Sequence, residues 1–209
     1  MTNTLSRPCA PSRRQLLAGF VLSACALYGV KASASEVQLD GYSFPDTATV
    51  GGQNLVLNGV AASSILSTRS SVVGFYLPSK QKTMETATAV KGPKRIQFYM
   101  VRNVSARDLS NALLDRIRQN VSREEFGANI IATAQLGTVF STIPRISKGD
   151  KVVIDYLPAT ASTEFTLNGQ KIGDTIQGEA FFPMMMKVWI GPKVRDTTRD
   201  GLLGLTEAP

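Results

Sequence analysis

The chain has 209 residues, of which 23 are basic, 16 are acidic, two are cysteines and none is histidine, and its formal net charge is +7. Without histidine the chain can assemble neither a Ser-His-Asp nor a Cys-His nucleophile, and it can offer no imidazole to a metal. Any general base must therefore be Asp, Glu, Lys, Tyr or a water molecule.

Residues 1–34 have the features of an export signal. The segment contains four basic residues and no acid, and an apolar run from Leu16 to Val30 follows the pair Arg13-Arg14. Ala32-Ser33-Ala34 offers a small-x-small cleavage site, and the paired arginines suggest the twin-arginine route. We expect cleavage after Ala34, which leaves a periplasmic or otherwise exported protein.

Two alternatives to cleavage concern the same segment. The apolar run could remain as an N-terminal anchor, although it is short for a membrane span of about 20 residues. The stretch Leu22-Ser23-Ala24-Cys25 resembles a lipobox, in which Cys25 would carry a lipid. Because the residues after Cys25 are still apolar, cleavage after Ala34 is favoured.

Removal of the signal changes the composition of what remains. Residues 35–209 keep 19 basic residues against 16 acids, a net charge of +3, which gives no reason to expect a nucleic-acid partner. Both cysteines, Cys9 and Cys25, leave with the signal, so we predict no disulfide, no thiolate metal site and no cofactor. The remaining 175 residues suit a single domain with its own core.

The expected elements alternate between strands and helices in blocks. Alternating apolar residues predict strands over 37–44, twice within 54–78, and over 94–102, 151–157 and 163–172. Asn58-Gly59 and Asn168-Gly169 are both signals for a tight hairpin turn. Helices are expected over 80–91, from Ser105, from Ser122 to Pro144, over 179–190 and over 195–205. This order predicts an α+β fold with a largely antiparallel sheet.

Three helical features bear on function. The helix from Ser105 has a core-facing stripe at three- and four-residue spacing, formed by Leu109, Ala112, Leu113, Arg116 and Ile117. Ser122 and Glu125 match a capping box, which explains the acidic residues Glu124 and Glu125 without a catalytic role. The run Met184-Met185-Met186 could line an adaptable cavity or belong to an ordinary core.

The strand that follows Arg69 carries the candidate binding site. Arg69 and Ser71 share one strand face with an apolar series, and Arg102 ends a similar apolar face on the strand 94–102. If these strands are neighbours, two guanidiniums and a hydroxyl could hold a carboxylate by charge-assisted hydrogen bonds. Alternatively, each arginine pairs with an acidic residue at the edge of the sheet.

A series of short motifs resembles bacterial chalcone isomerase-like proteins, in the same order and over nearly all of residues 37–205. The motifs are Phe44-Pro45-Asp46, Leu57-Asn58-Gly59, Gly74-Phe75-Tyr76-Leu77-Pro78, Gly92-Pro93-Lys94-Arg95-Ile96, Lys148-Gly149-Asp150, Asp155-Tyr156-Leu157-Pro158, Leu167-Asn168-Gly169, Gly178-Glu179-Ala180-Phe181-Phe182 and Trp189-Ile190-Gly191. The resemblance implies an open-faced β-sandwich, in which a layer of helices covers one large antiparallel sheet.

The same resemblance implies that catalytic residues of the family are missing. The family threonine falls on Ser71, which keeps the hydroxyl, and a family basic residue corresponds to Arg102. The family arginine should fall within Gly59 to Ser63, where there is none; Ser63 stands in the usual place of the arginine of bacterial relatives. The family tyrosine falls near Leu109. Stabilisation of a developing oxyanion would then be largely lost.

Three functions follow from these observations. The first is non-catalytic binding of a small apolar or fatty-acid-like ligand, including a carboxylate, at Arg69, Ser71 and Arg102, since some members of this superfamily bind fatty acids without catalysis. The second is an isomerase, an intramolecular lyase of the chalcone isomerase type. The third is an interaction module of the cell envelope that binds no small ligand.

Overall fold

The computed structural model describes residues 35–64 and 68–206, so the expected signal at 1–34 lies outside the described residues. All of the elements belong to one compact unit of the chain. In chain order they are β1 (Glu36–Leu39), β2 (Tyr42–Pro45), β3 (Thr47–Val50), β4 (Gln53–Ser63), β5 (Ser71–Leu77), α1 (Met84–Ala89), β6 (Lys94–Met100), β7 (Val104–Ser105), α2 (Ala106–Asn120), α3 (Arg123–Ala128), α4 (Ile130–Val139), β8 (Arg145–Ile146), β9 (Lys151–Leu157), the 3-10 turn η1 (Pro158–Thr160), β10 (Ser162–Leu167), β11 (Gln170–Gln177), α5 (Phe181–Ile190) and α6 (Asp196–Leu202).

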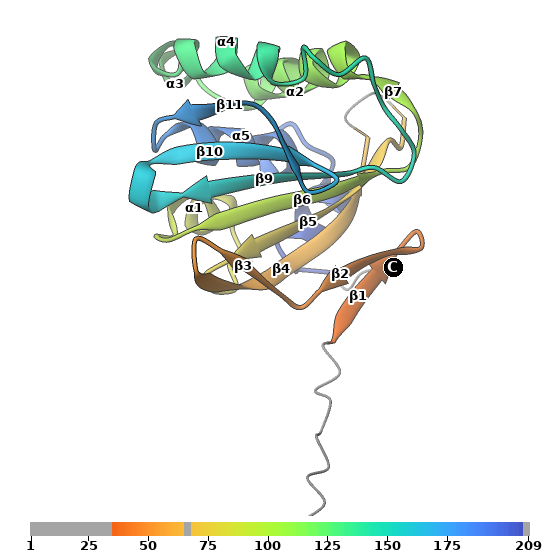
Figure 1. Ribbon diagram of the computed structural model, residues 1–209. Coiled ribbons are helices and arrows are strands. Elements are labelled where there is room, and N and C mark those ends of the chain that lie inside the picture. The colour runs from red at the N-terminus through yellow and green to blue at the C-terminus, as the bar shows by residue number, and fades with distance from the viewer. Residues whose placement is uncertain (1–34, 65–67, 207–209) are drawn as a thin grey trace, which may run out of the picture. The chain divides into compact units, whose positions relative to one another are not determined.

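One large sheet organises the fold. It has seven strands in the order β11-β10-β9-β6-β5-β4-β3, and all neighbouring pairs are antiparallel. Figure 1 shows α5 and α1 on one side of these strands and the hairpin β1–β2 beside the other side. The expected α+β class with a helix-covered antiparallel sheet is therefore confirmed.

The main core lies between the sheet and the helices. On β6 every second residue enters it, namely Ile96, Phe98 and Met100, because side chains alternate along a strand. The rings of Phe75 and Phe98 pack against Trp189 of α5, with centroids 6.3 and 5.8 Å from it. Aromatic packing of this kind fixes the position of α5 over the centre of the sheet.

The opposite face of the sheet has a smaller core of its own. There the hairpin β1–β2 packs Leu39 and Phe44 against residues of β4 and β5 such as Val72. Gly74 makes this contact possible, since a Cβ atom at that position would lie 2.6 Å from Cδ1 of Phe44. The hairpin thus covers part of a face that an open-faced sandwich leaves bare.

The two Asn-Gly pairs have different structures. Asn168 and Gly169 have φ angles of 51° and 83° and close the β10–β11 hairpin, as the sequence predicts. The expectation of a turn at Asn58-Gly59 was wrong, because both residues lie inside the long strand β4. The Asn58 side chain binds the backbone of Gln81 and donates to the carbonyl of Leu202 at 2.7 Å, so it joins β4 to α6.

The helices α2, α3 and α4 differ from the sequence prediction at one point. Ser105 caps α2 and Ser122 caps α3, each accepting a backbone amide hydrogen bond as expected. The single helix predicted from Ser122 to Pro144 is two helices, broken at Asn129, whose ψ of 21° departs from helical geometry. Glu125 binds Lys187 of α5 at 2.7 Å with both carboxylate oxygens. Within the described segments, no helix has the length and apolarity needed to cross a membrane.

Candidate functional site

The fold gives the three residues of the predicted binding site different surroundings. Ser71 is the first residue of β5 and is 1% exposed, and its Oγ has no hydrogen-bond partner among the described residues. It stands at the end of the face that carries Val73 and Phe75 into the main core. Its burial is therefore compatible with a polar contact inside the core.

Arg69 is directed elsewhere. Its guanidinium forms an ion pair with the carboxylate of Asp40 at 2.5 Å, and Asp40 lies in the turn of the β1–β2 hairpin. Because this hairpin packs on the opposite side of the sheet, the ion pair orients Arg69 away from the helix-covered core. Arg102 is exposed and lies two residues beyond the end of β6. Since the Ser71 hydroxyl has no partner in the described part of the chain, the three residues do not form one cluster of hydrogen bonds there.

Ser71 instead faces a second serine. Ser63 is its direct partner in the β4–β5 register, and both side chains are buried. Directly paired residues of antiparallel strands share one face, with Cβ atoms about 5 Å apart. The positions to which the resemblance assigns the family threonine and arginine are therefore adjacent, and both carry short hydroxyl side chains. Leu109, at the place of the family tyrosine, is buried in the main core.

Arg116 of α2 places a cation close to these serines. The Nη2 atom of Arg116 donates to the carbonyl oxygen of Ser64 at 3.1 Å. Thr198 of α6 donates through Oγ1 to the carbonyl of Ala62 at 2.8 Å, which holds α6 against the same end of β4. The sequence signal for Arg116 was present, because it is a cation on the core-facing stripe of its helix.

We call this region the serine corner; it consists of Ser63, Ser64, Ser71, Arg116 and Thr198. Its members other than Ser71 line a cavity of about 10 Å³, roughly the space of one water molecule. Val188 and Val194 form the apolar wall, and Arg195 stands at the rim. The described lining residues offer two guanidiniums and several hydroxyls but no carboxylate, thiol or imidazole, which suits the binding of an anion better than proton transfer.

Soft side chains fill part of the main core on the same side of the sheet. Met184, Met185 and Met186 of α5 are all fully buried. Nε1 of the fully buried Trp189 has no hydrogen-bond partner in the described residues. The hydroxyl of Thr163 on β10 is also buried there without a partner among the described residues. An unpaired polar group in a core costs about 1–3 kcal/mol, so the described part of this core holds three donors that a ligand could satisfy.

A second cation lies on the helix side of the sheet. Lys94 of β6 is 3% exposed, and its ammonium stands 5.3 Å from the ring centroid of Tyr156. Burial, together with the nearby charge of Lys91, lowers the pKa of Lys94 to about 8. The group is therefore poised to lose its proton under mildly basic conditions.

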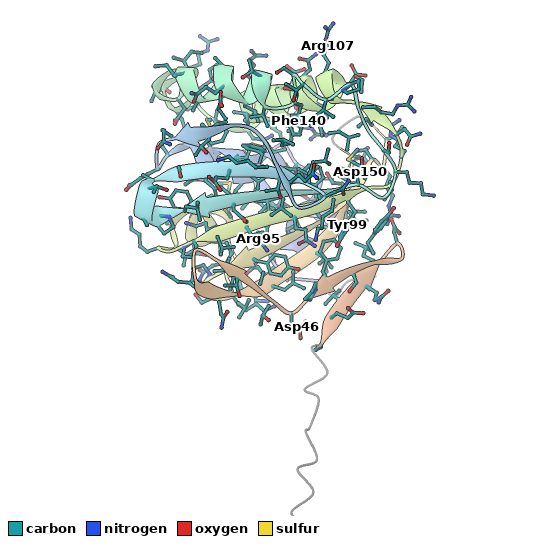
Figure 2. The ribbon with its side chains drawn as sticks, viewed as in Figure 1. Asp46, Arg95, Tyr99, Arg107, Phe140 and Asp150 are labelled. Carbon is teal, nitrogen blue, oxygen red and sulfur yellow. The ribbon has the colours of Figure 1, made fainter. Side chains whose placement is uncertain are left out.

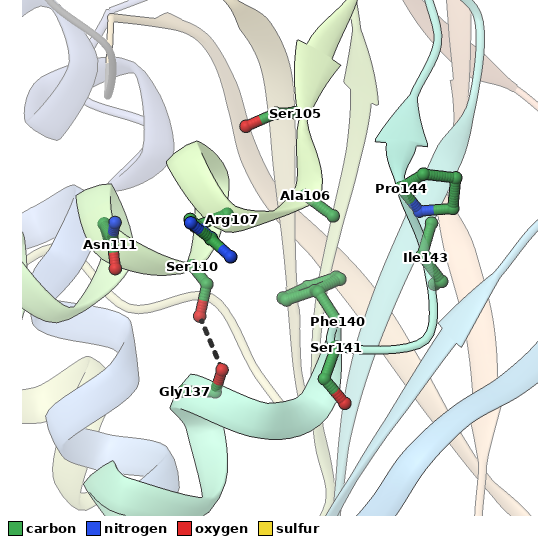
Figure 3. A pocket seen from close by; sticks show the side chains of 10 residues that line it. All are labelled: Ser105, Ala106, Arg107, Ser110, Asn111, Gly137, Phe140, Ser141, Ile143 and Pro144. Carbon is green, nitrogen blue, oxygen red and sulfur yellow. Dashed lines mark hydrogen bonds between the residues drawn. The ribbon is translucent and has the colours of Figure 1, made fainter.

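Another hollow lies at the edge of this core, away from the serine corner. It has a volume of about 600 Å³ and lies between the start of α2 and the end of α4 (Figure 3). Its buried hydroxyl, that of Ser110, already donates to the carbonyls of Leu136 and Gly137. None of its lining residues belongs to the serine corner. In the described residues no group of three or more His, Cys, Asp or Glu side chains could hold a metal ion.

Comparisons with known proteins agree with this fold. The family model described as chalcone isomerase-like matches residues 36–204. Among solved structures, the chain is similar to an Arabidopsis thaliana fatty-acid binding protein, with a TM-score of 0.66 and 14% sequence identity. The similarity covers 81% of this chain and 96% of that one. No curated protein matches the sequence.

Proposed function

The chain belongs to the chalcone isomerase-like family, and on that premise we propose that it binds a small apolar ligand with an acidic head, such as a fatty acid, without catalysing a reaction. The observation that carries this proposal is that buried donors on the helix-covered side of the sheet lack partners among the described residues, the Ser71 hydroxyl and the Trp189 indole among them. A carboxylate at the serine corner would satisfy the Ser71 hydroxyl and lie beside Arg116.

The adjoining core supports an apolar body for the ligand. The cavity is now about the size of one water molecule, so a fatty chain must displace side chains to enter. Methionine is the side chain best suited to such repacking, because it is unbranched and rotates about three bonds. The Met184–Met186 run lies on the helix that covers the centre of the sheet. The name of the Arabidopsis relative, a fatty-acid binding protein of similar fold, points to the same ligand class.

Titration with laurate tests the proposal. Trp189 is the single tryptophan of the chain and is fully buried, so its fluorescence should report a ligand in this core. We expect saturable binding that Arg116→Met weakens at least tenfold. Arg107→Met on the same helix is the matched control, since Arg107 is exposed and lines the outer hollow instead.

A further variant separates the two possible positions of the acidic head. The double change Arg69→Ala and Arg102→Ala removes the cations that the sequence pattern favours, and leaves the serine corner intact. If that double variant loses laurate while Arg116→Met keeps it, the head lies at the predicted arginine cluster. If neither change affects binding, or if native mass spectrometry of the protein with laurate shows no adduct, ligand binding in this core is refuted.

A second candidate function is an interaction module of the cell envelope. Ile130 and Ile131 at the start of α4 are 54% and 74% exposed, although large aliphatic side chains are usually buried. An exposed apolar pair suits a protein partner. Recovery of one specific partner by crosslinking, lost in Ile131→Ser, would favour this function over ligand binding.

Export is a proposal as well. Residues 1–34 would direct the chain out of the cytoplasm and be removed after Ala34; the supporting features are the paired arginines, the apolar run and the small residues at the cleavage site. Intact-mass measurement on the exported protein tests it. A mature chain beginning at Ser35 is expected, and a chain beginning at a lipidated Cys25 would contradict it.

A further inference from the structure

A second cavity lies on the face of the sheet opposite the serine corner. It has a volume of about 370 Å³ and is floored by the strands at the centre of the sheet. On β6 the residues between the core positions point into it, namely Arg95, Gln97 and Tyr99. Figure 2 shows Arg95 and Tyr99 on the side of the sheet that faces the viewer, with Asp46 below them.

The walls of this cavity are fixed in place. Ser43 and Pro45 of β2 with Thr47 and Ala48 of β3 form its rim. The adjoining hairpin is held to the sheet by Phe44, which occupies the space above Gly74. A site built on central strands and a tightly packed hairpin is preorganised for a ligand.

Several polar side chains on the floor of the cavity already form hydrogen bonds or an ion pair. Arg95 binds Asp155 through Nε and Nη2 at 2.7 and 2.6 Å, which leaves Nη1 outside the pair. Gln97 donates to the Tyr99 hydroxyl at 3.3 Å, and Tyr99 donates to the carbonyl of Ser43 at 3.3 Å. These bonds hold the side chains of the row in defined positions.

Tyr76 is the exception in this network. It is 1% exposed and lines the cavity from β5, directly opposite Arg95, yet its hydroxyl has no partner among the described residues. A buried hydroxyl without a partner is costly, and native structures rarely retain one without a reason. A ligand atom that accepts its hydrogen bond would supply that reason.

The lining also selects the charge and shape of a ligand. Among its described lining residues the charged side chains are the cations Lys151 and Arg95, the second of which is paired with Asp155. The rings of Tyr76 and Tyr99 and the side chains of Pro45 and Ala48 supply apolar contact. We propose that this cavity is a second binding site, which takes a small aromatic carboxylate with its charged end between the Tyr76 hydroxyl and the two cations.

Isothermal titration with sodium 2-naphthoate tests this site in the purified protein. We expect saturable binding, at least tenfold weaker in Tyr76→Phe, which removes only the hydroxyl, and several-fold weaker in Lys151→Gln. Tyr156→Phe is the matched control, because Tyr156 is also a buried strand tyrosine but faces the main core. The uncharged analogue 2-naphthalenemethanol should bind at least tenfold more weakly than 2-naphthoate.

The outcomes separate this site from the serine corner. Arg116→Met should leave 2-naphthoate binding unchanged, and Tyr76→Phe should leave laurate binding unchanged. Absence of saturable heat with 2-naphthoate overturns the proposal, and so does equal affinity in Tyr76→Phe and wild type, or equal affinity for the uncharged analogue. Should Tyr76→Phe fail to fold, Lys151→Gln at the rim replaces it in the same comparison, and equal affinity in that variant and wild type overturns the proposal.

Discussion

Replacement of Lys94 by methionine should stabilise the protein at neutral pH. Lys94 is nearly fully buried on β6, and its pKa is lowered from 10.5 to about 8, first by burial and then by the charge of Lys91. At pH 7 the amine is protonated both in the folded and in the unfolded chain. The folded state therefore carries the whole cost of burying the ammonium, which is about 3 kcal/mol for a shift of this size.

Part of that cost is offset by the ring of Tyr156. The ammonium lies 5.3 Å from the ring centroid, and a contact of this kind contributes about 1 kcal/mol. Methionine has a similar length and no charge, so it removes both terms. The expected gain in unfolding free energy at pH 7 is the difference, about 2 kcal/mol.

The pH dependence of the stability difference between Lys94→Met and wild type tests this explanation. Between about pH 8 and 10.5 the folded protein releases the Lys94 proton while the unfolded chain keeps it, so the wild type gains stability from this group as pH rises. The advantage of Lys94→Met should therefore shrink across this window. Urea unfolding followed by Trp189 fluorescence, from about pH 7 to 10.5, measures it, with the exposed Lys148→Met as the control. A Lys94→Met variant less stable than wild type at pH 7, or an advantage independent of pH, would refute the reasoning.

Two further predictions concern packing and buried hydroxyls. Gly59→Ala should cost about 3 kcal/mol in thermal unfolding, because the new Cβ atom would lie 2.1 Å from the carbonyl oxygen of Gly201 in α6. Gly127→Ala on α3 meets no neighbouring atom and should gain up to about 1 kcal/mol; similar effects of the two changes would contradict the close approach. Ser71→Ala should raise stability by up to about 1 kcal/mol and weaken laurate binding, because it removes a buried hydroxyl without a partner among the described residues. Ser110→Ala removes a hydroxyl that donates to Leu136, so a loss of about 1 kcal/mol is expected; urea unfolding of both serine variants should give opposite signs.

The sequence predicts most of the sheet because strand alternation and tight turns depend on residues that are neighbours along the chain. Alternation along 94–102 and 151–157 places β6 and β9 correctly. The turn at Asn168-Gly169 needs only its own backbone. Asn58-Gly59 has the same two residues, but it lies inside β4, where Asn58 donates to Leu202, 144 positions away along the chain. No local pattern contains that contact.

In the candidate site, too, local patterns were predicted and contacts between distant parts of the chain were not. Alternation places Ser71 on an apolar strand face, as the structure does. It cannot show that Asp40, from a separate hairpin, would take the guanidinium of Arg69. The cation beside the serines comes instead from α2, and its position depends on how that helix packs. Arg116 could be recognised only as a charge on the core-facing side of its helix.

The two ends of the described chain also determine when the fold can close. α6 lies against β4 through Gly59 and Asn58, while the hairpin β1–β2 packs on the other face of the same part of the sheet. Strand β4, near the start of the domain, therefore obtains part of its helix-side cover from α6. Contacts of such sequence separation slow folding, since a long loop must close before they form. During synthesis part of the apolar surface of β4 stays uncovered until α6 has left the ribosome, and exposed strand surface of this kind is prone to aggregation.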